Sequence, residues 1–73
     1  MDNRITVIDY TGRENSLYIN LEVFDANHNK LYKEEVRFLD DLLYGDLVHE
    51  GRSPLSDTCR EEVVGYLKKY FNR

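Results

Sequence analysis

The sequence predicts an α+β fold: a three-stranded antiparallel sheet, a short acidic helical segment and a C-terminal amphipathic helix that packs on the sheet. Two apolar patterns indicate this class, one alternating every second residue before residue 40 and one with helical spacing after residue 53. A length of 73 residues leaves little room for a second core, so we expect a single domain over residues 1–73.

The first two strands are predicted at Ile5–Tyr10 and Leu17–Phe24. The first is rich in β-branched and aromatic residues, and Thr11–Asn15 contains the Gly and Asn of a turn. The second strand alternates strictly between apolar and mostly polar residues, which is typical of a half-buried strand.

A third strand is predicted over Leu31–Phe38, after the polar turn Asp25–Lys30. Alternation places Tyr32, Val36 and Phe38 on one face with Glu34, whereas Glu35 lies on the opposite face. Strand, turn and strand at this spacing predict a hairpin, and the first strand completes a meander. The first and third strands would form the edges of this sheet.

The segment that follows is acidic and is predicted to contain one or two short helical turns. A continuous helix over residues 39–50 would place Asp46 and Glu50 among the leucines, which is unfavourable. We therefore expect the first turn, capped by Asp40 or Asp41, to end near Gly45 and a second turn to open at Asp46.

The C-terminal helix is predicted to begin at Ser53–Pro54, with Thr58–Glu61 as a competing capping box one turn later. Its acidic residues lie early and its basic residues late, as the helix dipole favours. One stripe is predicted to face the sheet: Leu55, Cys59, Val63, Tyr66, Leu67 and Tyr70, widened by Val64 and Phe71.

Composition limits the possible cellular context and partners. No apolar run is long enough to span a bilayer, no signal peptide is evident, and a single cysteine suits a reducing compartment, so we expect a cytoplasmic protein that does not bind membranes. The net charge of −4 argues against direct nucleic-acid binding. Because so small a core is marginal, we expect a homodimer.

No catalytic, metal or cofactor site is expected. Cys59 faces the apolar stripe, where a thiol is inert, and no His or Ser has a recognisable catalytic partner. Asp46, His49 and Glu50 would supply part of a zinc site, but no second ligand pair accompanies them. The four glycines are too scattered to form a phosphate-binding loop, so we expect no enzymatic activity.

The acidic middle is the candidate binding surface. Residues 34–50 hold six acidic residues and one basic residue, and Tyr44 offers an amphipathic ring among them. The candidate partner surface comprises Glu34, Glu35, Asp40, Asp41, Tyr44, Asp46 and Glu50. It would bind a basic protein by charge complementarity, and an ordinary solubilising surface remains the alternative interpretation.

The chain resembles small acidic phage-encoded inhibitors that mimic DNA. The resemblance covers about half of the chain and rests on its acidity, the Tyr-containing hairpin Tyr18–Phe38 and the following Leu43–Tyr44–Gly45 segment. It is similar to the dimeric inhibitors of uracil-DNA glycosylase and to host-takeover proteins that target the histone-like protein HU. The long C-terminal helix from Pro54 to Phe71 departs from the glycosylase-inhibitor pattern, and no functional residue carries over.

The resemblance and the charge pattern together lead to one functional hypothesis and one alternative. The hypothesis is a dimeric, non-enzymatic inhibitor, located in the host cytoplasm if phage-encoded, whose acidic surface binds a basic host protein in place of DNA. The alternative is a general protein–protein interaction module or housekeeping adaptor, in which the edge of the β-hairpin pairs with a partner strand.

Overall fold

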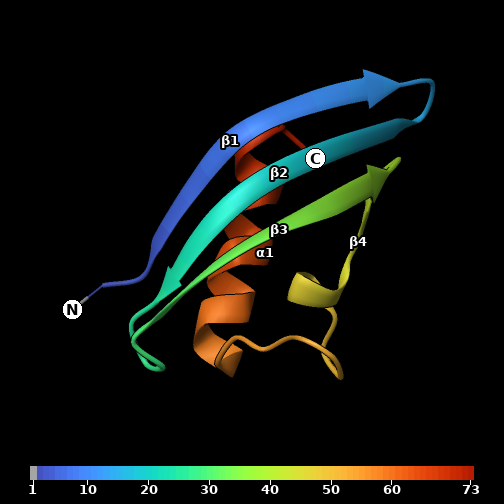
Figure 1. Cartoon of the computed structure of the whole chain (residues 1–73). Coiled ribbons are helices and arrows are strands. Elements are labelled where there is room, and N and C mark those ends of the chain that lie inside the picture. Colours follow the sequence, from blue (N-terminus) through green and yellow to red (C-terminus); the bar gives the residue numbers. More distant parts are fainter. Residues whose placement is uncertain (1) are drawn as a thin grey trace.

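A computed structural model describes residues 2–73 and shows an antiparallel sheet with one C-terminal helix (Figure 1). The elements follow the order β1 (Arg4–Arg13), β2 (Ser16–Asp25), β3 (Lys30–Leu39), β4 (Leu42–Tyr44), a 3₁₀ turn (Asp46–Val48) and α1 (Asp57–Tyr70). The strands lie in the order β1-β2-β3-β4, so every neighbour in the sheet is also a neighbour in sequence. The predicted α+β class is confirmed.

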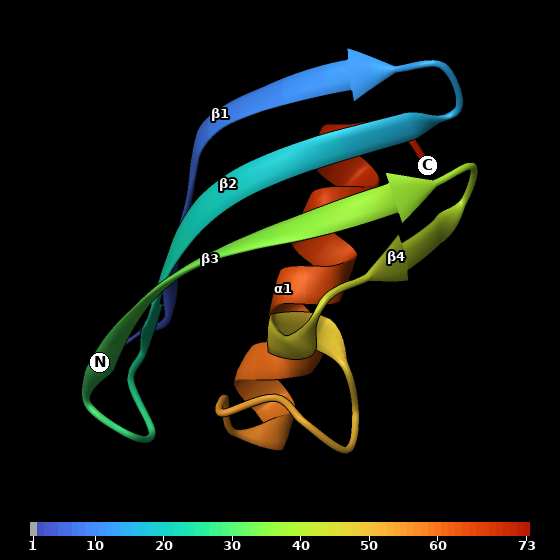
Figure 2. The same cartoon turned by 45° about the vertical axis from the view of Figure 1, so that its right-hand side comes forward.

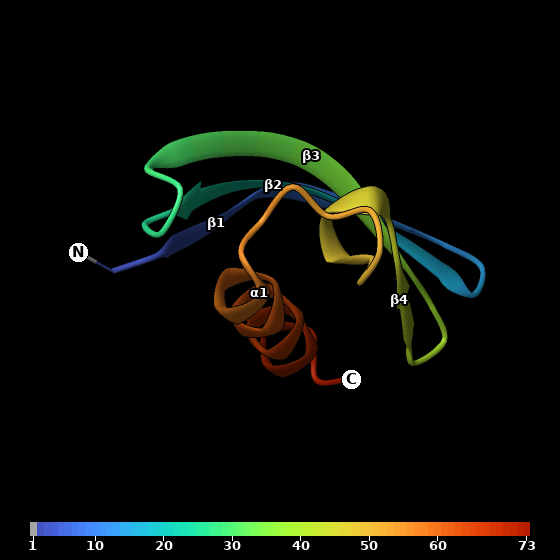
Figure 3. The same cartoon turned by 90° about the horizontal axis from the view of Figure 1, so that it is seen from below.

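The sheet is curved, and α1 lies across one of its faces (Figure 3). We call the face toward α1 the inner face and the opposite face the outer face. Register pairs Ile19 with Val36 and Leu17 with Phe38, and all four side chains are buried on the inner face. The outer face is covered by no other element among the described residues (Figures 1 and 3).

Two corrections concern the segment after β3. The helical turn expected around residues 39–43 is wrong, because these residues end β3, turn at Asp40–Asp41 and form the short strand β4 (Figure 2). Asp40 adopts a positive φ of 55°, which Asp tolerates in tight turns. The sheet therefore has four strands, and β3 is paired on both sides at its C-terminal end. The turn expected at Asp46 is present as the 3₁₀ turn.

The start of α1 also differs from expectation. Ser56 is its N-cap residue, whereas Ser53 and Pro54 belong to the preceding loop. The Ser53 hydroxyl accepts a hydrogen bond from the Leu55 amide at 3.1 Å and donates one to the Leu47 carbonyl. Ser53 therefore folds the loop onto the 3₁₀ turn instead of capping the helix.

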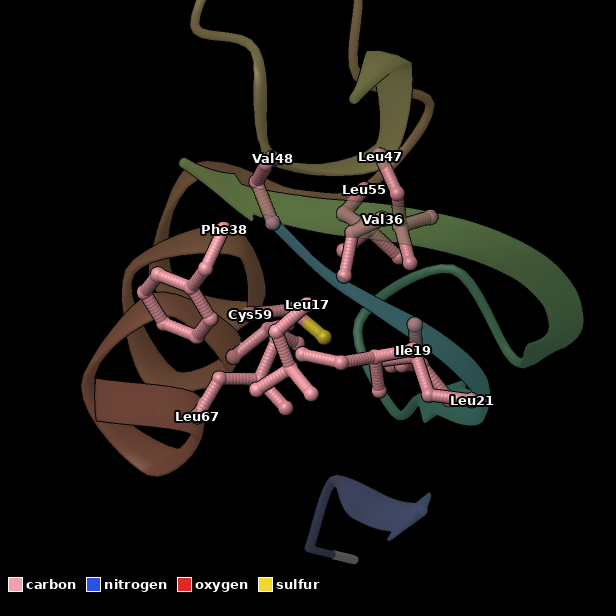
Figure 4. Close-up of a cluster of buried hydrophobic side chains, with 12 residues drawn as sticks. Leu17, Ile19, Leu21, Val36, Phe38, Leu47, Val48, Leu55, Cys59 and Leu67 are labelled. Atoms are coloured by element: carbon pink, nitrogen blue, oxygen red, sulfur yellow. The ribbon is translucent and has the colours of Figure 1, made fainter. Parts of the chain in front are cut away.

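The core is a single apolar cluster between the inner face and α1 (Figure 4). The predicted helix stripe is confirmed for Cys59, Val63 and Leu67, which are all buried, whereas Leu55 is buried but lies in the loop before α1. The 3₁₀ turn adds Leu47 and Val48 to the cluster. Tyr66 and Tyr70 were predicted to lie in the stripe, but both are exposed, and Tyr70 is the last residue of α1.

Candidate functional site

The acidic candidates gather around Tyr44 at one end of the sheet. Asp40 and Asp41 form the turn that leads into β4, which ends at Tyr44. After Gly45, Asp46 begins the 3₁₀ turn, and Glu50 lies in the following loop. All four carboxylates are exposed, as a binding surface requires.

Adjacent glutamates on β3 separate because successive strand residues face opposite sides of a sheet. Glu34 is paired with Leu21 and belongs to the inner face, whereas Glu35 is paired with Asn20 on the outer face. Glu35 and Tyr44 line the same shallow depression, together with Tyr18. The structure thus places Glu35 beside the Tyr44 region and separates Glu34 from it.

We name the resulting patch the acidic–aromatic surface. It consists of Glu35, Asp40, Asp41, Tyr44, Asp46 and Glu50, together with the exposed apolar residues Leu39 and Leu42. Leu42 is 60% exposed and Tyr44 is 43% exposed, so both present apolar area to solvent. Large apolar side chains ringed by charge are typical of protein-binding surfaces.

Basic side chains interrupt the negative charge of this surface. The Arg37 guanidinium lies 5.7 Å from the centre of the Tyr44 ring, and Arg52 lies 3.8 Å from the Asp46 carboxylate. The Arg73 guanidinium donates a hydrogen bond of 2.7 Å to the Asp40 carbonyl. The surface is therefore acidic with basic side chains interspersed among the carboxylates.

An open groove of about 590 Å³ adjoins this surface between β4 and α1. Asp41 and Glu50 supply negative charge along it, and Arg60 and Lys68 of α1 supply positive charge. Its floor is apolar, with contributions from Leu43, Val48 and Val64. Such a groove suits an amphipathic peptide segment better than a small polar molecule.

A buried carboxylate forms a second polar centre, which the sequence did not reveal. The Asp25 side chain is fully buried and accepts hydrogen bonds from the Ser56 amide at 2.7 Å and the Ser56 hydroxyl at 3.0 Å. The amides of Asn27 and His28 donate to the same carboxylate at 3.0 and 3.4 Å. Burial alone would raise the pKa of Asp25, but these hydrogen bonds outweigh it and lower the pKa below its ordinary value.

Neighbouring amides extend the Asp25 network across three segments. The Asn27 side-chain amide donates to the hydroxyls of Ser56 and Thr58 at 3.0 and 2.9 Å, and the Asn3 side chain accepts from the Ala26 amide at 2.8 Å. The imidazole of His28 lies 3.3 Å from the Asp25 carboxylate. The network joins the β2–β3 turn to the start of α1. Its role is therefore structural.

Cys59 is buried in the core, as its helical position predicts. Burial, with the charges of Asp25 and Glu62, raises the pKa of the thiol to about 11. Among residues 2–73, no three His, Cys, Asp or Glu side chains are grouped closely enough to hold a metal ion. No helix in this range is long and apolar enough to cross a membrane.

Comparisons with known proteins do not assign this chain to a family. The chain matches no protein-family model, no curated protein and no solved structure.

Proposed function

We propose that this protein is a small non-enzymatic binding protein whose acidic–aromatic surface binds a basic protein and competes with nucleic acid for it. The observation that supports the proposal is the clustering of five carboxylates around exposed Leu42 and Tyr44 at one end of the sheet. Apolar anchors supply binding free energy, while surrounding charge selects the partner and speeds association.

The partner that fits this surface is a protein with Lys and Arg side chains around an accessible apolar site. Arg37 and Arg52 already neutralise part of the acidic–aromatic surface, so a partner with interspersed acidic residues would fit better than a purely basic peptide. A DNA-binding protein that exposes its phosphate-binding face presents such Lys and Arg side chains.

Competition with DNA tests the proposal directly. The histone-like protein HU is mixed with a labelled DNA duplex at low salt, and this protein is added in increasing excess. We expect the DNA to be released and the release to weaken as salt screens the charges. If HU retains its DNA in large excess of this protein at low salt, HU is not the target and nucleic-acid competition fails for it.

Charge placement is tested with variants of equal net charge. Asp40→Asn, Asp41→Asn and Asp46→Asn together should weaken the competition at least tenfold. The control combines Asp2→Asn, Asp57→Asn and Glu61→Gln, three exposed carboxylates outside the surface. If both triple variants compete with DNA equally weakly, the net charge of the protein determines the competition, and the proposal of a localised binding surface is refuted.

The apolar anchors are tested in the same assay. Truncation of a central anchor typically costs about 2 kcal/mol of binding free energy, so Tyr44→Ala should weaken binding about thirtyfold. Leu31→Ala is the control, because Leu31 is 56% exposed at the opposite end of β3.

Strand addition at β1 is a second candidate. Among residues 2–73, β1 pairs only with β2, so one side of its backbone is unpaired there, and Ile8 is exposed at the irregularity after Val7. A partner strand would bind there with little dependence on salt. The amides of Thr6 and Val7 point to opposite sides of β1, so one of them points away from β2. Proline at that residue removes the N–H that a partner strand would need, so it should abolish such binding and leave the acidic–aromatic surface unaffected.

A further inference from the structure

The middle of α1 contains a glycine whose presence no contact within residues 2–73 explains. Gly65 is exposed, and a Cβ atom at its position would meet no heavy atom within 4 Å. Glycine in a helix interior costs about 1 kcal/mol relative to alanine. Neither backbone conformation nor packing within the chain offsets this cost, which suggests that another molecule approaches the helix closely at Gly65.

The surroundings of Gly65 form a continuous helix face. Glu62, Gly65, Tyr66 and Lys69 have the spacing i, i+3, i+4 and i+7, so they lie side by side along one flank of α1. All four are exposed, with Tyr66 at 39%. The Tyr70 ring stacks on that of Tyr66, with centroids 5.8 Å apart, and extends the apolar area toward the helix end.

This flank is distinct from the groove beside β4. Arg60, Val64 and Lys68 face the groove, whereas Tyr70 contacts Phe71, whose ring lies 5.0 Å from that of Tyr10 on β1. The Gly65 flank therefore lies on the side of α1 away from the acidic–aromatic surface. Any partner bound there would leave that surface free.

The charges on this flank are complementary to themselves. If a second α1 lies antiparallel, with a two-fold axis between Gly65 and Tyr66, each Glu62 faces the Lys69 of the other copy. The same axis places each Tyr66 ring over the Gly65 of the other copy, where no side chain obstructs it. Helices packed through a glycine can approach to the lower end of the usual 8–10 Å range of axis separations.

We propose that this chain forms a two-fold symmetric dimer through the Glu62–Gly65–Tyr66–Lys69 face of α1. The occupant is a second copy, because one helix face presents both members of the charge pair and both members of the ring–glycine contact. The proposal does not depend on the binding function of the acidic–aromatic surface.

The dimer is tested first by sedimentation of the wild-type chain at concentrations from about 1 μM to 1 mM, a range that covers the affinities expected of a small interface. We expect the mass to change from that of one chain to that of two chains. A single-chain mass throughout this range would overturn the proposal.

The predicted contacts are tested by charge exchange. Glu62→Lys and Lys69→Glu should each weaken dimerisation at least tenfold, because like charges then face each other across the axis. The double variant should recover the wild-type affinity, since the pair is restored with opposite polarity. Lys68→Glu, a charge reversal on the flank of α1 that faces the groove beside β4, is the control and should leave the dimer intact. Failure of the double variant to recover, or equal loss in the control, would refute the antiparallel pairing.

Close approach at Gly65 is tested with Gly65→Gln. Glutamine favours helix and meets no obstacle within the monomer, so the variant should be at least as stable as the wild type when dilute. Its melting temperature should not rise with protein concentration, whereas that of the wild type should. A Gly65→Gln variant that dimerises like the wild type would show that this face is not the interface.

Discussion

The Asp25 carboxylate accepts hydrogen bonds from both the backbone amide and the side-chain hydroxyl of Ser56, a residue that follows it by 31 positions. Asp25 ends β2, and Ser56 is the N-cap residue of α1. The negative charge therefore lies at the positive end of the helix dipole, where a carboxylate is stabilised. One buried side chain thus fixes the helix to the turn between β2 and β3.

Removal of this carboxylate should destabilise the fold strongly. Asp25→Ala leaves the Ser56 amide and its neighbours without their acceptor, and we expect a loss of about 3 kcal/mol in the free energy of unfolding, measured by urea denaturation. Asp9→Ala is the control, because Asp9 accepts its hydrogen bond from Asn20 at an exposed site and should cost less than about 1 kcal/mol. Similar losses for both would contradict the role of the buried network.

Asp25 should also give the fold a dependence on acid. Its pKa is lowered in the folded protein, so its stabilisation is fully present above the ordinary value of 3.8 and is lost as pH falls through the folded pKa. The free energy of unfolding of the wild type should fall more steeply below pH 4 than that of Asp25→Asn. Parallel curves for the two proteins in urea titrations would contradict this assignment.

Cys59 should be unreactive in the folded protein. It is buried, and its raised pKa of about 11 keeps the thiol protonated at neutral pH. We expect labelling by a thiol reagent at pH 7.5 to be slower than that of the urea-unfolded chain by a factor of about 10³. Rapid labelling without denaturant would show that the core around Cys59 opens readily.

Gly45 should not tolerate a side chain. Its φ of 142° is nearly restricted to glycine, and a Cβ atom would lie 3.0 Å from Cγ1 and 3.2 Å from the Cα atom of Val36. Gly45→Ala should therefore cost about 1–3 kcal/mol of stability in thermal or urea unfolding. Gly12→Ala in β1 is the matched control, because no atom lies near that position, and it should change stability by less than about 0.5 kcal/mol.

Periodicity predicted the parts of the fold that depend on burial. The alternation in β2 identified its inward set, Leu17 to Val23, and helical spacing identified Leu55, Cys59, Val63 and Leu67, all of which are buried. Strand β4 was missed because three residues are too few to show a period, and its turn residues, Asp40 and Asp41, also suit a helix cap.

The polar network and the shape of the candidate surface depend on tertiary structure. Asp25 and Ser56 each resemble ordinary turn and cap residues, and only the docking of α1 brings them together. Alternation did place Glu34 and Glu35 on opposite faces, as the register shows. The basic side chains of Arg52 and Arg73 near Asp46 and Asp40 were not predictable, because loop geometry determines them.

The two ends of α1 are attached to the sheet by interactions of different kinds. Its start is held by hydrogen bonds to the Asp25 carboxylate, and its end by the Phe71 ring, which lies edge-on to Tyr10 and 6.2 Å from Phe38. Acid below about pH 3.8, which protonates Asp25, therefore weakens the start of α1 before it affects the aromatic contacts at the other end. As pH falls through the folded pKa of Asp25, the first turn of α1 should fray while Phe71 stays packed against Tyr10 and Phe38.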